Sequence, residues 1–426
     1  MTTTPTAATG TAPGPDEEGG ASSRRRLVVV GHGVAAHRLI SELRMHDRAG
    51  AWQVLAVGDE PYAAYNRIGL PGHLAGGPPD ALALAAQDHD PLVEIRLATP
   101  VASVDRATRS VLTADGERLG YDALVLATGA APFRPPVPGL DLPGCHPFRT
   151  LDDARRIRGA LRPGVPAVVI GGGLLGLETA WAIHRLGARA AVVETAPRLM
   201  PAQLDDTAAA MVADRLRGDG VRLHCAASVR SVEAGRDGGA AAVLLEDGTR
   251  LPAELVVYSA GVRPRDELAA PAGLARGERG GFLTDGLCRT EDPLVWAIGD
   301  CAALRGRCHG LVAPGYRMAE AVAAQLLGRP AQELAESTAP TRLKVPGVAV
   351  ASLGDAHART PGAVELSFTA PGAGGTGERY ARLVLDAAAR RLLGAVLVGH
   401  DDAYMLLSSL VGEELPASAD RLLTAA

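Results

Sequence analysis

Residues 167–194 read AVVIGGGLLGLETAWAIHRLGARAAVVE, and this stretch decides the fold. An apolar strand runs into Gly171, Gly173 and Gly176, and an amphipathic helix and a second apolar strand follow. The first glycine permits a tight turn, the second lets backbone N–H groups approach a pyrophosphate, and the third keeps the helix close to its strand. Glu194 ends the second strand about 20 residues further on, where a carboxylate binds ribose hydroxyls. The stretch therefore predicts a dinucleotide-binding βαβ unit.

The same pattern occurs earlier, at residues 26–57, as RLVVVGHGVAAHRLISELRMHDRAGAWQVLAV. Its three turn positions are Gly31, Gly33 and Ala36. Two acids, Asp59 and Glu60, follow the second strand and are placed to accept hydrogen bonds from a ribose. Glycine turns that bind nothing are the alternative, but strand, helix and acid occur in order in both copies. Two such units predict two dinucleotides, a bound FAD and an exchanging nicotinamide nucleotide, and therefore hydride transfer.

The acid of the later unit also bears on the choice of nicotinamide nucleotide. A glutamate at position 194 binds ribose hydroxyls and repels a 2′-phosphate, which favours NADH over NADPH. Arg198 lies four residues further on and could contact that phosphate, so NADPH stays possible.

Composition excludes several classes of partner. The chain has 426 residues, a formal net charge of -5 and 47% hydrophobic residues, which is typical of a globular protein of two or three domains with no charge attraction to nucleic acid or an anionic membrane. No apolar run approaches the ~18 residues of a membrane span. The run SSRRRLVVV resembles a twin-arginine signal, but no cleavage site follows, so we interpret it as a first strand. We expect a disordered tail at residues 1–23 and a cytoplasmic protein.

The five cysteines are scattered and form no CxxC pair, which predicts neither a disulfide framework nor a dithiol redox motif. Cys301 and Cys308 match no common zinc or iron–sulfur spacing, so buried or incidental thiols are the favoured interpretation. The histidines form no HxxxH pair either. We predict no metal.

Three further motifs connect the two units to a known family. YDALVLATGAAPFRPPVPG (residues 121–139), SAGVRPRDEL (259–268) and VWAIGDCA (295–302) follow in family order. Together with the two glycine turns they resemble the two-dinucleotide flavoproteins that include ferredoxin, rubredoxin and glutathione reductases. The segments VGHGVAAHRLISEL, EPYAAYNRIGL, VIGGGLLGLETA and SLGDAHARTPGA are more narrowly similar to the flavin portion of the assimilatory NAD(P)H nitrite reductase large subunit.

The resemblance implies an α/β fold with two Rossmann-like domains of the three-layer ββα/α type and a small C-terminal α+β domain. The FAD domain is expected at residues 24–148 and 264–335, the NAD(P)H domain at 149–263 and the C-terminal domain at 336–426. In the C-terminal domain, apolar runs at 341–355 and 379–399 predict antiparallel strands, and 403–415 predicts a helix. In the family this domain supports the flavin site and sometimes a dimer interface, so either a monomer or a homodimer is compatible with the sequence.

The resemblance also implies cofactor-binding residues in two sets. The set for FAD is Gly31, Gly33, Val34, Ala35, Asp59, Glu60, Arg67, Val101, Ala127, Thr128, Gly129, Arg134, Gly299, Asp300 and Pro314. The set for the nicotinamide nucleotide is Gly171, Gly173, Leu174, Leu175, Glu178, Glu194 and Gly261.

Three side chains have specific expected roles. Asp300 is expected to bond the ribityl chain of FAD, and Arg67 to pair with the FAD pyrophosphate rather than stand free on the surface. Glu178 is expected to orient the nicotinamide, and the alternative is a carboxylate that only interacts with the helix dipole. AYNRIGLPG (residues 64–72) has neither the cysteine of a disulfide relay nor the lysine that some relatives place near flavin N5.

These expectations favour an enzyme, an FAD-dependent NADH oxidoreductase that passes electrons to a separate acceptor protein. The resembling subunit continues into an iron–sulfur and siroheme portion, and this chain ends at Ala426 without those cysteines, so we expect that it does not reduce nitrite by that route alone. The alternatives are an oxidase or small-molecule reductase that reacts directly at the flavin, and a non-catalytic flavin-bound redox sensor.

Overall fold

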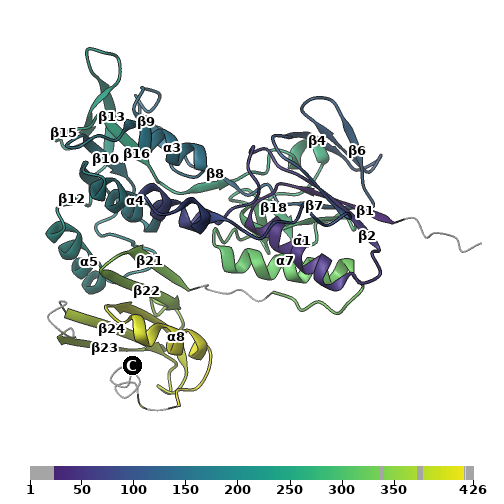
Figure 1. Cartoon of the computed structure of the whole chain (residues 1–426). Coiled ribbons are helices and arrows are strands. Elements are labelled where there is room, and N and C mark those ends of the chain that lie inside the picture. Colours follow the sequence, from purple (N-terminus) through teal and green to yellow (C-terminus); the bar gives the residue numbers. More distant parts are fainter. Residues whose placement is uncertain (1–23, 335–339, 372–377, 417, 419–426) are drawn as a thin grey trace, which may run out of the picture.

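The computed structural model describes residues 24–334, 340–371, 378–416 and 418, and the expected tail at 1–23 lies outside them. Two Rossmann-like domains lie side by side, and the C-terminal domain packs beneath one of them (Figure 1). Among the described helices, none combines the length and the apolar character that a membrane span requires.

The first domain is built on a five-stranded parallel sheet in the order β19-β7-β1-β2-β3. Its strands are β1 (Arg25–Val30), β2 (Trp52–Val57), β3 (Val93–Arg96), β7 (Ala123–Leu126) and β19 (Val295–Ala297). Helices α1 (Val34–His46) and α7 (Val312–Leu326) pack together beside this sheet. The strands are apolar on both faces because helices and a second sheet layer cover them, as expected for a parallel sheet.

The second domain repeats this arrangement with the sheet order β9-β16-β10-β11-β12. Its strands are β9 (Cys145–Pro147), β10 (Pro166–Ile170), β11 (Arg189–Val193), β12 (Arg222–His224) and β16 (Leu255–Tyr258). Its helices are α3 (Leu151–Ala160), α4 (Leu174–Arg185) and α5 (Asp206–Gly218). The pairing of β10 with β11 and β16 repeats that of β1 with β2 and β7, so equivalent positions can be compared directly.

Each domain carries a three-stranded antiparallel meander, between β3 and β7 in the first domain and between β12 and β16 in the second. The meanders are β4 (Val101–Asp105), β5 (Ser110–Thr113) and β6 (Arg118–Gly120) in the first domain, and β13 (Val229–Ala234), β14 (Ala240–Leu245) and β15 (Arg250–Pro252) in the second. Parallel sheets, helices and meanders form the three-layer fold predicted from the sequence, and the mixed α/β class is confirmed.

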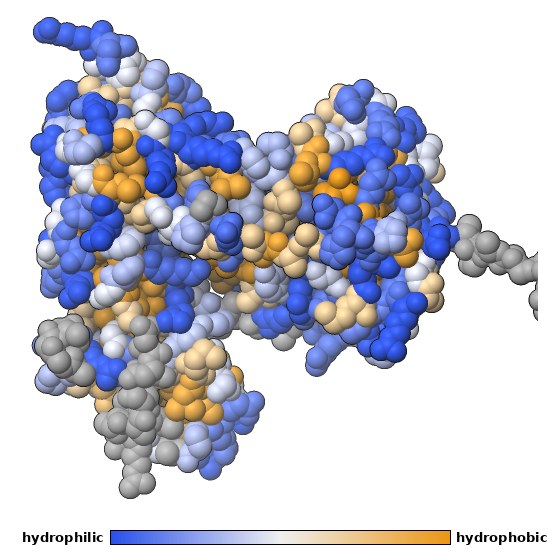
Figure 2. All heavy atoms as spheres, viewed as in Figure 1, coloured by the Kyte–Doolittle hydropathy of each residue, from blue (hydrophilic) through white to orange (hydrophobic). Residues whose placement is uncertain are grey.

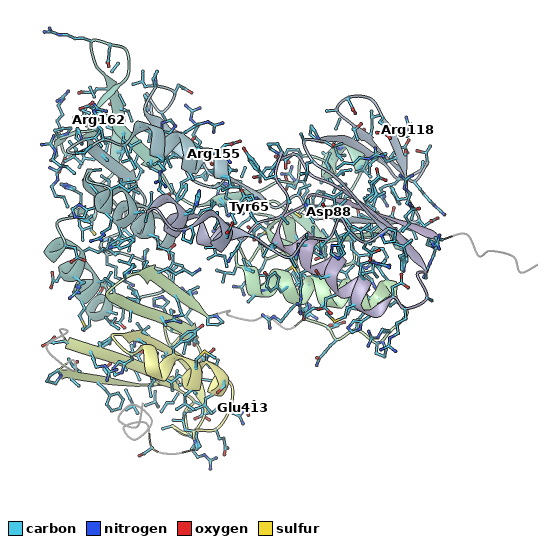
Figure 3. The ribbon with its side chains drawn as sticks, in the orientation of Figure 1. Tyr65, Asp88, Arg118, Arg155, Arg162 and Glu413 are labelled. Carbon is cyan, nitrogen blue, oxygen red and sulfur yellow. The ribbon has the colours of Figure 1, made fainter. Side chains whose placement is uncertain are left out.

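Short elements join the two domains. β8 (Ala130–Pro132) and β17 (Val262–Pro264) pair antiparallel. The segment that leads from the first domain to the second therefore runs beside the segment that returns. The remaining elements are η1 (Arg67–Gly69), α2 (Leu70–Leu74), η2 (Pro79–Leu82), α6 (Ala269–Ala272), β18 (Phe282–Thr284), η3 (Gly299–Cys301) and β20 (Ala302–Leu304). Residues Tyr65, Leu70, Leu74 and Leu82 belong to the same hydrophobic core as the second domain, and Tyr65 lies where the two domains meet (Figure 3).

The C-terminal domain is a five-stranded antiparallel sheet with one helix. Its order is β21 (Thr341–Val345), β22 (Val348–Gly354), β25 (Leu392–Val398), β24 (Glu378–Leu385) and β23 (Val364–Pro371), and α8 (Asp401–Leu410) covers one face. The antiparallel strands and the helix agree with the sequence prediction, and β23 is a strand that was not predicted. The helix was predicted over residues 403–415 and spans Asp401–Leu410. Met405 and Leu406 of α8 are exposed. Figure 2 shows apolar colouring on the C-terminal domain.

Candidate functional site

The first glycine turn, residues 31–36, closes tightly against the neighbouring strand. Gly31 has φ of +106°, and a Cβ atom there would lie 2.2 Å from the carbonyl oxygen of Ala127. Only glycine fits, since L side chains avoid this backbone region and the space is filled. A Cβ atom at Gly33, in contrast, would meet nothing within 4 Å. Because α1 begins at Val34, its free N–H groups face this open space, where a pyrophosphate fits.

Two segments from far along the chain meet the start of α1. A Cβ atom at Gly299 would lie 3.1 Å from the Cβ of Ala35, and one at Gly315 would lie 3.7 Å from it. Gly299 begins η3, and Gly315 follows the buried Pro314 in the first turn of α7. The structure thus brings the predicted residues 34, 35, 299, 300 and 314 together around one turn, which we call the first cradle.

The end of β7 forms another side of the first cradle. The Ala127 N–H donates to the carbonyl of Val30 at 2.7 Å, and the Thr128 hydroxyl donates to the carbonyl of Arg265 at 2.5 Å. Gly129 accepts from the Arg265 N–H at 2.9 Å. These bonds attach the ATG turn at residues 127–129 to the returning linker.

The acids of the first cradle are all paired with arginines. Arg265 pairs with Asp59 at 2.5 Å, and Arg67 pairs with Glu60 at 2.6 Å. Arg149 pairs with Asp300 at 2.5 Å. Arg67 also donates to the backbone carbonyl of Arg149 at 2.9 Å, so the Arg67–Glu60 and Arg149–Asp300 pairs are linked in one network. Arg67, which was expected to face a phosphate, is held by Glu60 and stacks 4.9 Å from the Tyr65 ring centroid.

Sequence reasoning missed two arginines that pair with these acids, Arg149 and Arg265. Arg149 lies two residues after β9, just before Thr150, which caps α3, and Arg265 ends the SAGVRPR segment. Both belong to segments that leave or re-enter the second domain. The available signal was an arginine shortly after a three-residue strand, which is too common to single out either residue.

Several buried polar atoms at the first cradle lack a hydrogen-bond partner in the protein. Both ring nitrogens of His32, between the two cradle glycines, are buried without a well-formed hydrogen bond, as is Nε of Arg149. Burial lowers the pKa of His32, and the neighbouring His37 lowers it further. With the open space at Gly33, these orphaned donors fit a phosphate- and ribose-bearing cofactor such as FAD.

Two residues of the expected FAD set lie elsewhere. Arg134 forms an ion pair with Asp141 on the linker and interacts with Tyr258 of the second domain. Val101 begins β4 and packs against the core of the first domain. Neither residue is among those that converge on the start of α1.

The second glycine turn, residues 171–176, has the same geometry as the first. Gly171 has φ of +115°, and a Cβ atom there would lie 2.5 Å from the carbonyl oxygen of Ser259. A Cβ atom at Gly176 would overlap the carbonyl oxygen of Gly171, whereas one at Gly173 would meet nothing within 4 Å. α4 begins at Leu174, so its N–H groups face open space as those of α1 do. We call this turn the second cradle.

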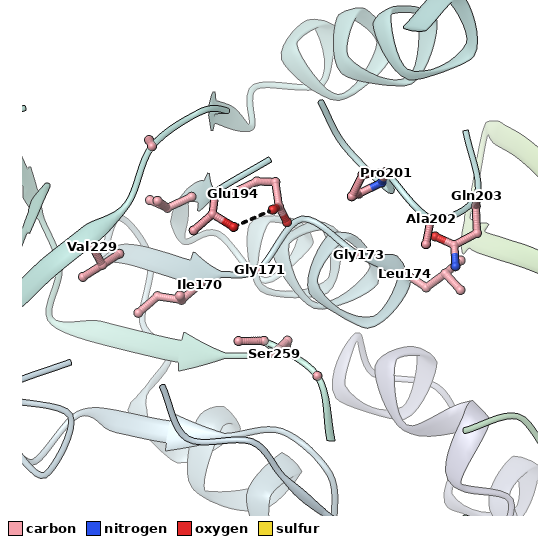
Figure 4. Close-up of a pocket in the computed structure, with 15 residues that line it drawn as sticks. Ile170, Gly171, Gly173, Leu174, Glu194, Pro201, Ala202, Gln203, Val229 and Ser259 are labelled. Atoms are coloured by element: carbon pink, nitrogen blue, oxygen red, sulfur yellow. Dashed lines mark hydrogen bonds between the residues drawn. The ribbon is translucent and has the colours of Figure 1, made fainter. Parts of the chain in front are cut away.

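The second cradle opens onto a cavity of about 370 Å³ (Figure 4). The predicted residues that line it are Gly171, Gly173, Leu174, Glu194 and Gly261. Leu175 follows Leu174 in α4 and is not among the lining residues. Ser259 also lines the cavity, and its buried hydroxyl has no hydrogen-bond partner, which suits a polar ligand.

Glu194 is held at the mouth of the second cradle. Its Oε2 accepts from the Gly172 N–H at 2.7 Å, and its Oε1 accepts from the Ala196 N–H at 2.8 Å. Arg198 donates to the carbonyl of Leu204 at 3.1 Å and pairs with Asp206 at 3.0 Å. The cavity therefore presents a carboxylate where a ribose is expected, while the nearby guanidinium is engaged elsewhere.

Glu178 lies in α4 with its carboxylate toward the C-terminal domain. Its side chain is buried, and Oε1 accepts from the Lys344 N–H of β21 at 2.8 Å. Burial raises the pKa of this carboxyl. Glu178 does not line the cavity at the second cradle, so the orienting role expected from the resemblance has no direct geometric support there.

Paired glycine cradles on two equivalent sheets, each with an acid after its second strand, are typical of α/β oxidoreductases that bind two dinucleotides. The family model for pyridine nucleotide-disulphide oxidoreductases matches residues 25–328. The chain therefore belongs to the pyridine nucleotide-disulphide oxidoreductase family, and it is an NAD(P)H oxidoreductase of the flavoprotein type that uses FAD.

Individual relatives agree with this assignment. The chain is 42% identical to the NAD(P)H nitrite reductase large subunit of Klebsiella oxytoca over 93% of this chain and 41% of that subunit, so it spans less than half of that relative. It is 35% identical to the ferredoxin–NAD(+) reductase component of the biphenyl dioxygenase system of Paraburkholderia xenovorans over 65% of this chain and 67% of that protein. The solved complex of putidaredoxin reductase with putidaredoxin matches with a TM-score of 0.82 and 27% identity, over 94% of this chain and 95% of the solved chain.

Proposed function

We propose that this chain takes a hydride from NADH with a bound FAD and passes electrons to a separate iron–sulfur or nitrite-reducing acceptor protein. The observation that carries the proposal is the presence of two equivalent cradles with different surroundings in one chain. Bound FAD accepts a hydride from a nicotinamide and can give up its electrons one at a time. A cytoplasmic location fits this role, because NADH is supplied there.

The chain's own residues bind and orient the two nucleotides. The N–H groups at the starts of α1 and α4 bind the pyrophosphates, and the glycines at 33 and 173 leave room for them. Asp59 or Glu60 and Asp300 bind sugar hydroxyls of FAD, which requires their arginine partners to rearrange or share them. Glu194 binds the ribose of the second nucleotide, and its negative charge favours NADH over NADPH.

Residues around the first cradle support direct electron transfer rather than a disulfide relay. Cys301 follows Asp300, but its thiol is fully buried and lies 3.3 Å from the carbonyl of Ile298. Burial raises the pKa of this thiol, which disfavours the reactive thiolate. Two similar proteins, the biphenyl dioxygenase component and putidaredoxin reductase, have a ferredoxin and putidaredoxin as their named partners.

An anaerobic titration tests the proposal. The FAD-loaded protein should lose its absorbance near 450 nm when NADH is added, and ferricyanide or a ferredoxin should restore it. Oxygen uptake without another acceptor should be slow. A protein that does not bind FAD, or whose flavin NADH does not reduce, would contradict the proposal, and fast NADH oxidation in air would favour the oxidase alternative.

A further inference from the structure

One wall of the cavity at the second cradle is a loop whose opposite side is buried. Pro201, Ala202 and Gln203 line the cavity, while Leu199, Met200 and Leu204 are almost completely inaccessible to solvent. The Met200 N–H donates to the carbonyl of Gly172 at 2.9 Å, so this loop is bonded to the cradle itself. Any displacement of residues 199–205 therefore moves the glycine turn.

The buried side of this loop shares a hydrophobic core with the C-terminal domain. Its three apolar side chains belong to one hydrophobic core with residues of the C-terminal sheet, namely Leu343, Val345, Val348, Val350, Tyr380, Val396 and Val398. α8 covers the opposite face of the sheet. One face of the C-terminal sheet therefore completes the core of the second domain, where β21 contacts α4 and β25 contacts α5. Figure 1 shows the C-terminal sheet beneath the second domain.

Polar bonds fix the same loop at two points. His357 Nε2 donates to the carbonyl of Ala202, a cavity-lining residue, at 3.0 Å. At the end of the loop, the Tyr380 hydroxyl donates to Asp205 Oδ2 at 3.2 Å, and Arg382 lies 3.7 Å from that oxygen. Asp205 Oδ1 accepts from the Ala208 N–H at 3.0 Å and caps α5. Tyr380 therefore acts on the loop and on the helix that follows it.

The other wall of the cavity is bonded to the same sheet. α4 begins at the second cradle, and Glu178 on α4 accepts from the Lys344 N–H of β21. The carboxylate is buried, and the group that donates to it is a backbone N–H. This contact therefore sets the position of α4 relative to β21. Both the loop and α4, which form two walls of the cavity, are therefore hydrogen-bonded to the C-terminal domain.

We infer that the C-terminal domain is part of the nicotinamide-nucleotide site, with His357 and Tyr380 as positioning residues that hold the loop 199–205 against the second cradle. This inference rests on the proposed assignment of that cavity to the nicotinamide nucleotide. It gives the C-terminal domain a role in the binding of the reductant, which differs from the flavin support and dimer contact expected from the resemblance.

Binding of ADP-ribose to the FAD-loaded protein, measured by isothermal titration calorimetry, tests the inference without redox chemistry. His357→Ala and Tyr380→Phe should each raise the Kd at least about fivefold, the change expected from the loss of one hydrogen bond, and the double variant should raise it further. In steady state, KM for NADH should rise while kcat changes little, since the reacting groups are untouched. FAD content and the thermal unfolding midpoint should stay close to wild type.

Matched controls separate positioning from general damage. Arg359→Ala changes an exposed side chain on the loop of His357, and Tyr404→Phe removes a hydroxyl on the opposite side of the sheet, so both should leave the Kd unchanged. Gly173→Val fills the space above the cradle and should abolish binding. If Gly173→Val binds ADP-ribose normally, the assignment of the cavity is wrong. If Gly173→Val fails to bind but His357→Ala and Tyr380→Phe bind like wild type, the positioning role is wrong and the assignment stands.

Discussion

The two cradles have the same strand order, the same glycine geometry and different surroundings. Around the first, η3 and α7 meet the start of α1, and every acid is paired with an arginine. The second opens onto a cavity, and its acid is held by backbone N–H groups. A closed, multiply bonded site suits a resident cofactor, whereas an open site with a preset carboxylate suits a nucleotide that exchanges at each turnover. The surroundings therefore support the proposed assignment of FAD to the first cradle and of the nicotinamide nucleotide to the second, which the glycine motifs alone do not distinguish.

The largest expected effect separates the two roles of glycine within the first cradle. Gly31→Ala places a Cβ atom onto the carbonyl of Ala127 at a positive φ, so it should cost about 3–5 kcal/mol of unfolding free energy. Gly33→Ala meets no protein atom and should cost about 1 kcal/mol or less while it weakens FAD binding. Urea unfolding of the FAD-free variants measures the difference, and equal losses would contradict the geometry.

The next effect concerns the arginine network that distinguishes the first cradle. Arg149→Met removes the partner of Asp300 and a guanidinium whose Nε is buried and unpaired, so FAD affinity should fall about 10- to 100-fold. FAD released after gel filtration and a fluorescence titration of the FAD-free protein measure the change. Arg158→Met, an exposed arginine on nearby α3, is the control. FAD affinity like that of wild type in Arg149→Met would show that the network is structural only.

A smaller change tests the acid of the second cradle. Glu194→Ala removes the charge that should repel a 2′-phosphate, so the ratio of kcat/KM for NADH to that for NADPH should fall about tenfold. We expect kcat/KM to rise for NADPH and to fall for NADH. Since Glu194 also accepts two backbone N–H bonds, Glu194→Gln is the control that keeps one acceptor. An unchanged ratio in both variants would remove Glu194 from nucleotide selection.

The smallest effect concerns His32, which has glycine as its counterpart in the second cradle. Its pKa is lowered in the folded state by burial, so the unfolded chain binds the proton more readily. This residue therefore lowers the stability of the FAD-free protein as the pH falls through the ordinary histidine range, and has no such effect at higher pH. His32→Asn should show a shallower loss of thermal midpoint between pH 7 and 5.5, and identical pH profiles would contradict this.

The sequence predicted the fold because strand, glycine turn and helix are local patterns that occur twice in the chain. The residues at 31, 33, 171, 173 and 194 lie where the motifs indicated, since β–α turns fix their geometry over a few residues. Arg149 and Arg265 could not be predicted, because their partners Asp300 and Asp59 lie more than a hundred residues away in sequence. The positions of Glu178, Arg134 and the C-terminal sheet likewise depend on how whole domains pack, which periodicity does not encode.

The central claim is that the first cradle holds FAD and the second holds NADH. Anaerobic NADH titration of flavin absorbance in wild type, Gly33→Val and Gly173→Val tests it most directly. We predict that Gly33→Val is purified without flavin yet still binds ADP-ribose, whereas Gly173→Val keeps its flavin spectrum and is no longer bleached by NADH. A Gly173→Val protein that is bleached at the same NADH concentrations as wild type would contradict the account.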